Sequence, residues 1–241
     1  MFHKPFEIKI DASKCTSLVE GGAFLDGKKV YDAWRFKDVS LESGKIYGLV
    51  GEYEQGPMYL SYLLGGKVDF GDLRLFCNGH ELSRNMLEQV SWNLEPSNEK
   101  YRKAVVKKSI VKALNENGCT EDFSTIAEKF ILTEPRYNRK LFQLSGERWR
   151  ASAALGYVNR KKIYYAPYKP SNFYYRMCNC GLLKVLRELT DDGAIVLLPA
   201  GSDEFLRYIV GECIYTNREY DILGLRKLYA EMFQKEEWIK E

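Results

Sequence analysis

The chain has 241 residues, of which 45% are hydrophobic and 29% are charged, a composition that excludes a disordered chain and indicates a folded globular protein. Its 36 basic and 33 acidic residues leave a net charge of +3, which gives no indication of nucleic-acid binding. Only two histidines are present, His3 and His80, so a histidine-rich metal site and a Ser-His-Asp triad are both disfavoured.

The sequence predicts neither secretion nor a direct membrane span. Its first ten residues lack the apolar core of a signal peptide, and its longest uncharged apolar run, 193–201, falls well short of the ~20 residues that cross a bilayer. Six cysteines are scattered along the chain, and only Cys178 and Cys180 lie close together. Because no second pair accompanies them, we expect reduced thiols in a cytoplasmic protein rather than zinc ligands.

The first quarter of the sequence predicts strands followed by one short helix. Residues 5–10 alternate between apolar and charged side chains, as a half-buried strand does. Asp26-Gly27 separates two apolar segments and predicts a hairpin turn. Residues 45–50 are apolar on both faces, which is typical of a central parallel strand. Pro57 then suits the first turn of a helix that two glycines end after residue 64.

The rest of the chain predicts mostly helices. We expect helices over 98–115, 121–130, 147–157, 174–189 and 221–240, and strands over 162–166 and 194–198. The middle helices form a helical subdomain, 85–158, inserted within a single domain that spans 1–241. This order predicts an α/β fold with a mostly parallel sheet and an antiparallel N-terminal part. In such a sheet, ligands bind at the carboxyl ends of the strands.

The loop after the first parallel strand has the glycine spacing of a P-loop, from Gly51 to Gly56, between a strand and a helix. A working P-loop continues with lysine, which neutralises phosphates, and with a hydroxyl residue, which binds Mg²⁺. Pro57 and Met58 occupy those positions, and proline has no N–H to offer a phosphate. Glu52 and a second glutamate place carboxylates inside the loop. These residues predict a loop that does not bind nucleotide.

A second motif, Leu144-Ser145-Gly146-Glu147, follows the predicted helical subdomain. Together with the loop, this order of motifs resembles the ATP-binding subunits of ABC transporters over nearly the whole chain. That family has a P-loop, a glutamine loop, a helical subdomain, an LSGGQ signature, an acidic strand, a D-loop and a switch histidine. The resemblance implies a P-loop NTPase-like fold, with the four residues quoted as a signature that carries an acid in place of one glycine.

The resemblance also implies that the residues of ATP hydrolysis are replaced. Tyr165 stands for the aspartate that supports Mg²⁺, Ala166 for the catalytic glutamate and Gly201 for the switch histidine. Glu95 stands where the family's glutamine loop has its glutamine. Asn172 falls near the position at which the family has the D-loop aspartate. Hydrolysis needs positive charge and Mg²⁺ at the phosphates and a group that orients water. We therefore expect no catalytic residues and no cofactor at the chain's own site.

The signature carries a separate expectation. In the family, two domains enclose ATP, and each site joins the P-loop of one domain to the signature of the other. Ser145 and Gly146 therefore predict that this chain completes an ATP/Mg site of a partner, in an asymmetric heterodimer, with a homodimer as the other open arrangement. Glu147 argues against this role, because it is expected to bring an acid near the γ-phosphate. The alternative interpretation of Ser145 is an ordinary helix N-cap.

Four functions follow from these observations. The leading one is a non-hydrolysing subunit that pairs with a competent ABC ATP-binding subunit and a transmembrane permease, at the inner face of the cell membrane. The second is a soluble regulatory or scaffold protein that uses the fold without nucleotide. The third is an atypical ATPase. The fourth is an unrelated α/β enzyme with Cys178 or Cys180 as its nucleophile.

Overall fold

The computed structural model describes most of the chain. Its described residues are 2, 5–13, 19–25, 28–34, 38–51, 56–95 and 102–216, with the backbone alone for 19–25 and 28–34. The helix predicted over 221–240 and the turn predicted at Asp26-Gly27 lie outside these residues. None of the described helices has the length and apolar content needed to cross a membrane.

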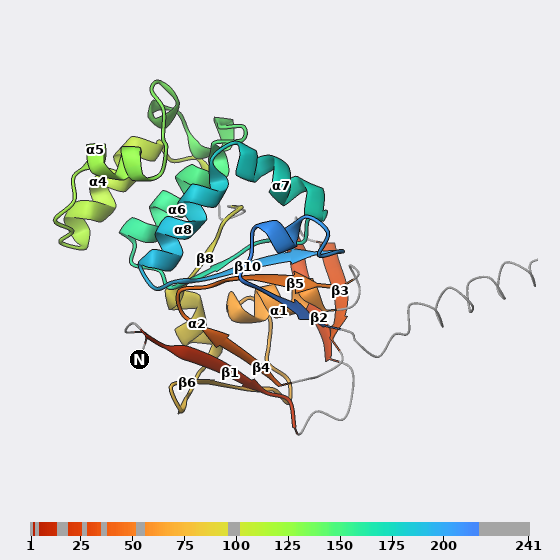
Figure 1. The fold of residues 1–241 in the computed structure, drawn as a ribbon. Coiled ribbons are helices and arrows are strands. Elements are labelled where there is room, and N and C mark those ends of the chain that lie inside the picture. The colour runs from red at the N-terminus through yellow and green to blue at the C-terminus, as the bar shows by residue number, and fades with distance from the viewer. Residues whose placement is uncertain are drawn as a thin grey trace, which may run out of the picture.

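A five-stranded parallel sheet forms the centre of the fold (Figure 1). Its order is β11 (Glu212–Tyr215), β5 (Ile46–Val50), β10 (Ile195–Ala200), β9 (Ile163–Tyr165) and β8 (Ser91–Asn93). Every pair of neighbours is parallel. The predicted central strand is therefore confirmed, and all five residues of β5 are buried. Because the strands are parallel, their carboxyl ends meet at one edge, which is where a ligand site is expected.

Antiparallel strands from the N-terminal part form two further sheets. One has the order β4 (Val39–Glu42), β1 (Glu7–Asp11), β6 (Arg74–Cys77) and β7 (His80–Glu81), and the other pairs β2 (Val19–Leu25) with β3 (Lys28–Trp34). The predicted hairpin is confirmed, since Leu25 pairs with Lys28 across it. The strand predicted over 5–10 is β1, whose Ile8 and Ile10 point into the core.

Helices cover both faces of the central sheet. They are α1 (Pro57–Leu64), α2 (Arg84–Val90), α4 (Val106–Glu116), α5 (Phe123–Lys129), α6 (Arg148–Val158), α7 (Ser171–Asn179) and α8 (Leu182–Asp191). Single turns of 3₁₀-helix occur at Arg136–Asn138, Leu141–Gln143 and Leu206–Tyr208. The strand β8 lies within the range predicted for the helical subdomain and pairs with β9 in the central sheet. The helices α4, α5 and α6 of that range follow it.

The pleat of the sheet divides the interior into two cores. Tyr164, Val196 and Leu198 face one side, where they pack with α4, α6 and α8 in what we call the helical core. Tyr165 and Leu197 face the other side, where they pack with α1 and the antiparallel strands in what we call the strand core. Figure 1 shows the two layers on opposite sides of the sheet.

The single helix predicted over 174–189 is wrong, because the structure has two helices there. The range 174–189 contains two helices, α7 and α8, which are separated at Cys180 and Gly181. Gly181 has φ 89°, a left-handed conformation that side chains other than glycine rarely adopt. Apolar residues on both sides of Gly181 keep the spacing expected for one helix, so the hydrophobic periodicity gave no sign of the break.

Replacement of Gly156 in α6 tests the packing of α6 on the sheet. A Cβ at this position would lie 2.5 Å from Cε1 of Tyr164 and 2.8 Å from Cγ of Trp92. Alanine normally stabilises a helix interior relative to glycine. Here we expect Gly156→Ala to lower the free energy of unfolding by about 1–3 kcal/mol, because the core is overpacked. Urea denaturation measures this.

The matched control is Gly146→Ala, because a Cβ there meets no atom within 4 Å. We expect this variant to unfold at the urea concentration of the unaltered chain. If Gly156→Ala were as stable as the control, α6 would not lie this close to Tyr164 and Trp92.

Candidate functional site

The candidate site is the carboxyl edge of the parallel sheet. Five residues that follow the five strands mark it. They are Thr216 after β11, Gly51 after β5, Gly201 after β10, Ala166 after β9 and Glu95 after β8. Four of these are among the residues that the sequence predicted for a nucleotide site, and the sheet brings them to one edge. Thr216 was not predicted.

Gly51 is held tightly where the loop begins. Its N–H donates to the carbonyl oxygen of Ala200 at 3.1 Å, so this donor is used within the sheet. A Cβ on Gly51 would lie 2.6 Å from Oγ1 of Thr216 and 3.1 Å from Cγ of Pro57. Glycine is thus required here by close approach. Glu52, in the loop that follows, lies outside the described residues.

The helix α1 begins as predicted, with Gly56 as its N-cap and Pro57 as its first residue. Its second residue, Met58, is only 1% exposed and belongs to the strand core. All eight residues of α1 are buried. The position at which a P-loop presents a hydroxyl to Mg²⁺ therefore carries a thioether that faces the core and not the sheet edge.

The last residue of β9 and the residue after it, Tyr165 and Ala166, are buried. Tyr165 is 3% exposed, and its ring packs against the ring of Tyr62 at a centroid distance of 5.7 Å. Burial raises the pKa of its phenol far above the ordinary value, so the group stays neutral. Ala166 is fully buried, and its carbonyl oxygen accepts a hydrogen bond from Oγ of Ser61 at 2.7 Å.

Glu95 is the carboxylate that the sequence placed at this edge. It forms salt bridges with Nζ of Lys169 at 2.7 Å and with Nη2 of Arg148 at 3.3 Å. Both cations lie close to the sheet edge and are engaged with this acid. Because the carboxylate of Glu95 pairs with both cations, their positive charge attracts an anionic ligand at this edge less strongly.

The signature turn is open to solvent. Ser145 is exposed, Leu144 is buried, and a Cβ on Gly146 would meet no atom within 4 Å. The N-cap interpretation of Ser145 is wrong, because α6 starts at Arg148 and has Glu147 as its N-cap, with no side-chain cap bond. Ser145 instead closes the preceding turn through its carbonyl oxygen, which accepts from the N–H of Arg148 at 3.0 Å.

Glu147 does not lie where the sequence led us to expect it. The residue is 2% exposed, and its carboxylate accepts hydrogen bonds from N and Oγ1 of Thr133 at 2.7 and 2.8 Å. Arg136 and Arg150 pair with it at 3.4 and 3.5 Å. The expectation of an exposed acid on the signature is therefore wrong. The charge points inward and ties α6 to the segment that follows α5.

Sequence reasoning missed Tyr168 and Lys169, which follow β9. Tyr168 lines a cavity of about 350 Å³ together with Asn172 and Gly201. The remaining lining residues are Pro170, Ser171, Ser202, Glu204 and Phe205, so the charged residue among the described lining is an acid. The signal in the sequence was a tyrosine close behind a buried strand, where a long side chain can reach the neighbouring strand.

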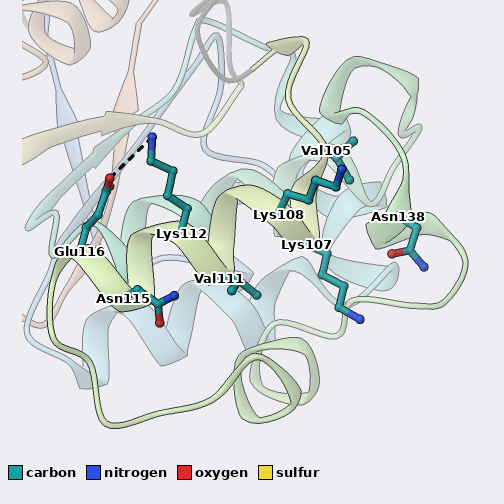
Figure 2. A pocket seen from close by; sticks show the side chains of 8 residues that line it. All are labelled: Val105, Lys107, Lys108, Val111, Lys112, Asn115, Glu116 and Asn138. Carbon is teal, nitrogen blue, oxygen red and sulfur yellow. Dashed lines mark ion pairs between the residues drawn. The ribbon is translucent and has the colours of Figure 1, made fainter.

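A second hollow lies on the exposed face of α4 and has a volume of about 740 Å³. Its lining residues are Val105, Lys107, Lys108, Val111, Lys112, Asn115, Glu116 and Asn138, most of which project from one face of α4 in Figure 2. Lys112 pairs with Glu116 at 3.6 Å. Val111 is 37% exposed between the lysines. This surface is basic with an apolar centre.

The structure gives no support for Cys178 as a nucleophile. Burial raises the pKa of Cys178 to about 11, so little thiolate forms at neutral pH. Among the described residues, no three His, Cys, Asp or Glu side chains are grouped so that they could hold a metal ion.

Comparison with known proteins gives the fold. No protein-family model and no curated protein matches the chain. A solved protein from Pyrococcus furiosus, assigned as an ABC transporter ATP-binding protein, matches with a TM-score of 0.58 and 13% identity, over 87% of this chain and 97% of the other. A nucleotide-free ATP-binding cassette from an ABC transporter matches with a TM-score of 0.56 and 12% identity, over 87% of each chain.

A bacterial Atm1-family ABC exporter with ATP bound matches with a TM-score of 0.59 and 13% identity. That match covers 98% of this chain and 43% of the exporter chain, so this chain spans less than half of the exporter's length. At these identities the likeness establishes the fold alone. The predicted P-loop NTPase-like fold, a parallel sheet with an antiparallel part, is confirmed as that of ABC transporter ATP-binding domains.

Removal of the buried carboxylate tests the structural role of Glu147. We expect Glu147→Ala to lower the free energy of unfolding by about 3 kcal/mol, because it leaves the largely buried guanidinium of Arg150 without its acid. Glu147→Gln should lose less, since the amide oxygen still accepts from Thr133. Glu116→Ala is the control, because its exposed pair with Lys112 is worth about 0.5 kcal/mol or less. Equal losses in the Glu147→Ala and control variants in urea denaturation would contradict an inward-facing Glu147.

Proposed function

We propose that the chain is an ABC-type ATP-binding subunit whose own site neither binds nor hydrolyses ATP. The observation that carries this proposal is that the side chains at the motif positions of the sheet edge are buried in the core or already paired. Mg²⁺ and a triphosphate require oxygen ligands and positive charge. Met58 and Tyr165 are both buried in the strand core, and Glu95 is already paired with two cations. The described residues of this edge do not fit Mg-ATP.

The open signature turn supports a second part of the proposal, a role at an ATP/Mg site of a partner. Gly146 has open space around it, and α6 follows with the positive end of its dipole toward the turn. The inward orientation of Glu147 leaves no carboxylate of that residue on the exposed surface. Ser145 and Gly146 can thus approach an anionic γ-phosphate that another subunit holds.

The partners follow from this division of labour. A competent ATP-binding subunit supplies the working P-loop, and a transmembrane permease at the inner face of the membrane supplies the transport pathway. We assign the permease contact to the exposed face of α4, because its lysines and Val111 give it charge and an apolar centre. A chain that binds no nucleotide and leaves a partner's ATPase unchanged would instead be the scaffold protein.

Titration of Mg-ATP into the purified chain tests the silent site. We expect no saturable heat in isothermal titration and no rise in melting temperature. The structural reason is that, among the described residues of the sheet edge, the cations Lys169 and Arg148 are already paired with Glu95. Micromolar binding would contradict the proposal and favour the atypical ATPase, which measured turnover would then decide.

Ser145→Arg tests the role at a partner's site. In the presence of an intact ABC ATP-binding subunit of the same genome, we expect the bulky cation to lower ATP turnover about tenfold or more, because it displaces a donor from the phosphates. Ser13→Arg, an exposed position beyond β1, is the control and should leave turnover unchanged. If both variants behave alike, the role of the signature is contradicted.

A further inference from the structure

Tyr168 crosses the carboxyl edge of the sheet from the loop that follows β9. In the sheet, β10 lies between β9 and β5. The hydroxyl oxygen of Tyr168 lies 3.5 Å from the carbonyl oxygen of Gly51, at the end of β5. The side chain therefore spans the end of β10 and reaches the first residue of the loop with P-loop spacing. Its ring packs on the strand core.

Gly201, directly after β10, lies beneath this phenol. A Cβ at position 201 would be 2.5 Å from the hydroxyl oxygen of Tyr168 and 3.6 Å from its Cζ. The first distance is shorter than real Cβ contacts allow, whereas the second is an ordinary contact. Gly201 is not among the residues with positive φ, so the constraint on a side chain here is the position of the Tyr168 phenol and not backbone conformation. Any other residue at position 201 would have to displace the phenol oxygen of Tyr168.

We propose that Tyr168 is an internal plug, which occupies the space between the ends of β5 and β10 and excludes an oxyanion ligand, and that Gly201 is the residue that makes room for it. This inference rests on the proposed function and deepens it, because it adds steric closure to the loss of charge. The neighbouring cavity of about 350 Å³ has Tyr168 as a wall and Glu204 as a charged lining residue, which also disfavours an anion.

A consequence distinguishes this plug from simple loss of active-site residues. A side chain at position 201, histidine included, cannot be added while the Tyr168 oxygen is in place. The substitutions at 168 and 201 must therefore depend on each other. Two unrelated losses would instead give effects that add.

The first experiment is a thermal double-mutant cycle without nucleotide. We expect Gly201→Ala to lower the melting temperature by about 3–8 °C. In the Tyr168→Phe background, where the nearest ring atom is Cζ at 3.6 Å, the same substitution should cost little. Gly211→Ala is the control, since its Cβ would meet only a carbonyl oxygen, that of Ile46, at 3.8 Å. Additive effects of the two substitutions would overturn the pairing of Tyr168 with Gly201.

The second experiment tests exclusion of the ligand with Mg-ATP as the probe. Pro57→Lys restores a cation at the P-loop position, and Tyr168→Ala removes the plug. We expect the combined variant to bind Mg-ATP at least tenfold more tightly than Pro57→Lys alone. Equal affinity of the two would overturn exclusion by Tyr168. If Pro57→Lys does not fold, Tyr168→Ala is compared with the unaltered chain, and failure of Tyr168→Ala to bind Mg-ATP more tightly would overturn exclusion by Tyr168.

The two proposals fail in different ways. Binding of Mg-ATP to the unaltered chain would contradict the silent site, whatever the thermal cycle shows. Additive effects at positions 168 and 201 would contradict the plug. The proposal that the chain's own site binds no ATP would then rest on the loss of charged residues alone.

Discussion

The parallel pairing of β10 with β5 on one side and with β9 on the other is the constraint on which the rest of the structure depends. The register sets Ala200 opposite Val50 and Leu197 opposite Tyr165. The chain beyond β9 continues beside β10, where the N–H of Lys169 donates to the carbonyl oxygen of Pro199 at 3.2 Å. Tyr168 is thereby carried to the level at which β10 and β5 end. A shift of this register by one residue would move Tyr168 away from the site.

The same sheet explains why the end of β9 has no exposed functional group. Successive side chains in a strand point to opposite faces. Tyr164 enters the helical core and Tyr165 the strand core, and both faces of the sheet are covered. A carboxylate at position 165 would be buried among the side chains of the strand core, beside the ring of Tyr62, at a high desolvation cost. The aromatic residue stabilises the fold at a position where a metal-binding acid would destabilise it.

Sequence reasoning succeeded where a pattern is local. The apolar run of β5, the glycine spacing that follows it and Pro57 at the start of α1 all depend on neighbouring residues. It failed where the partner is distant in sequence or where backbone conformation overrides periodicity. The orientation of Glu147 depends on Thr133 and two arginines, which no spacing reveals. Gly181 broke a helix whose apolar pattern continues across it.

Two glutamates, Glu95 and Glu147, lie at motif positions of the resembled family, and both form ion pairs within the chain. The different consequences of these ion pairs define the proposed role. Each of these two carboxylates pairs with two cations of the same chain. At Glu95 this pairing uses the positive charge of the chain's own sheet edge, which lowers its attraction for phosphates. At Glu147 it withdraws negative charge from the signature turn, which in the proposed role removes repulsion toward phosphates held by another subunit. In the proposed arrangement, these ion pairs weaken the chain's own half of an ATP site and preserve the half that it offers to a partner, an asymmetry that a subunit contributing only its signature needs.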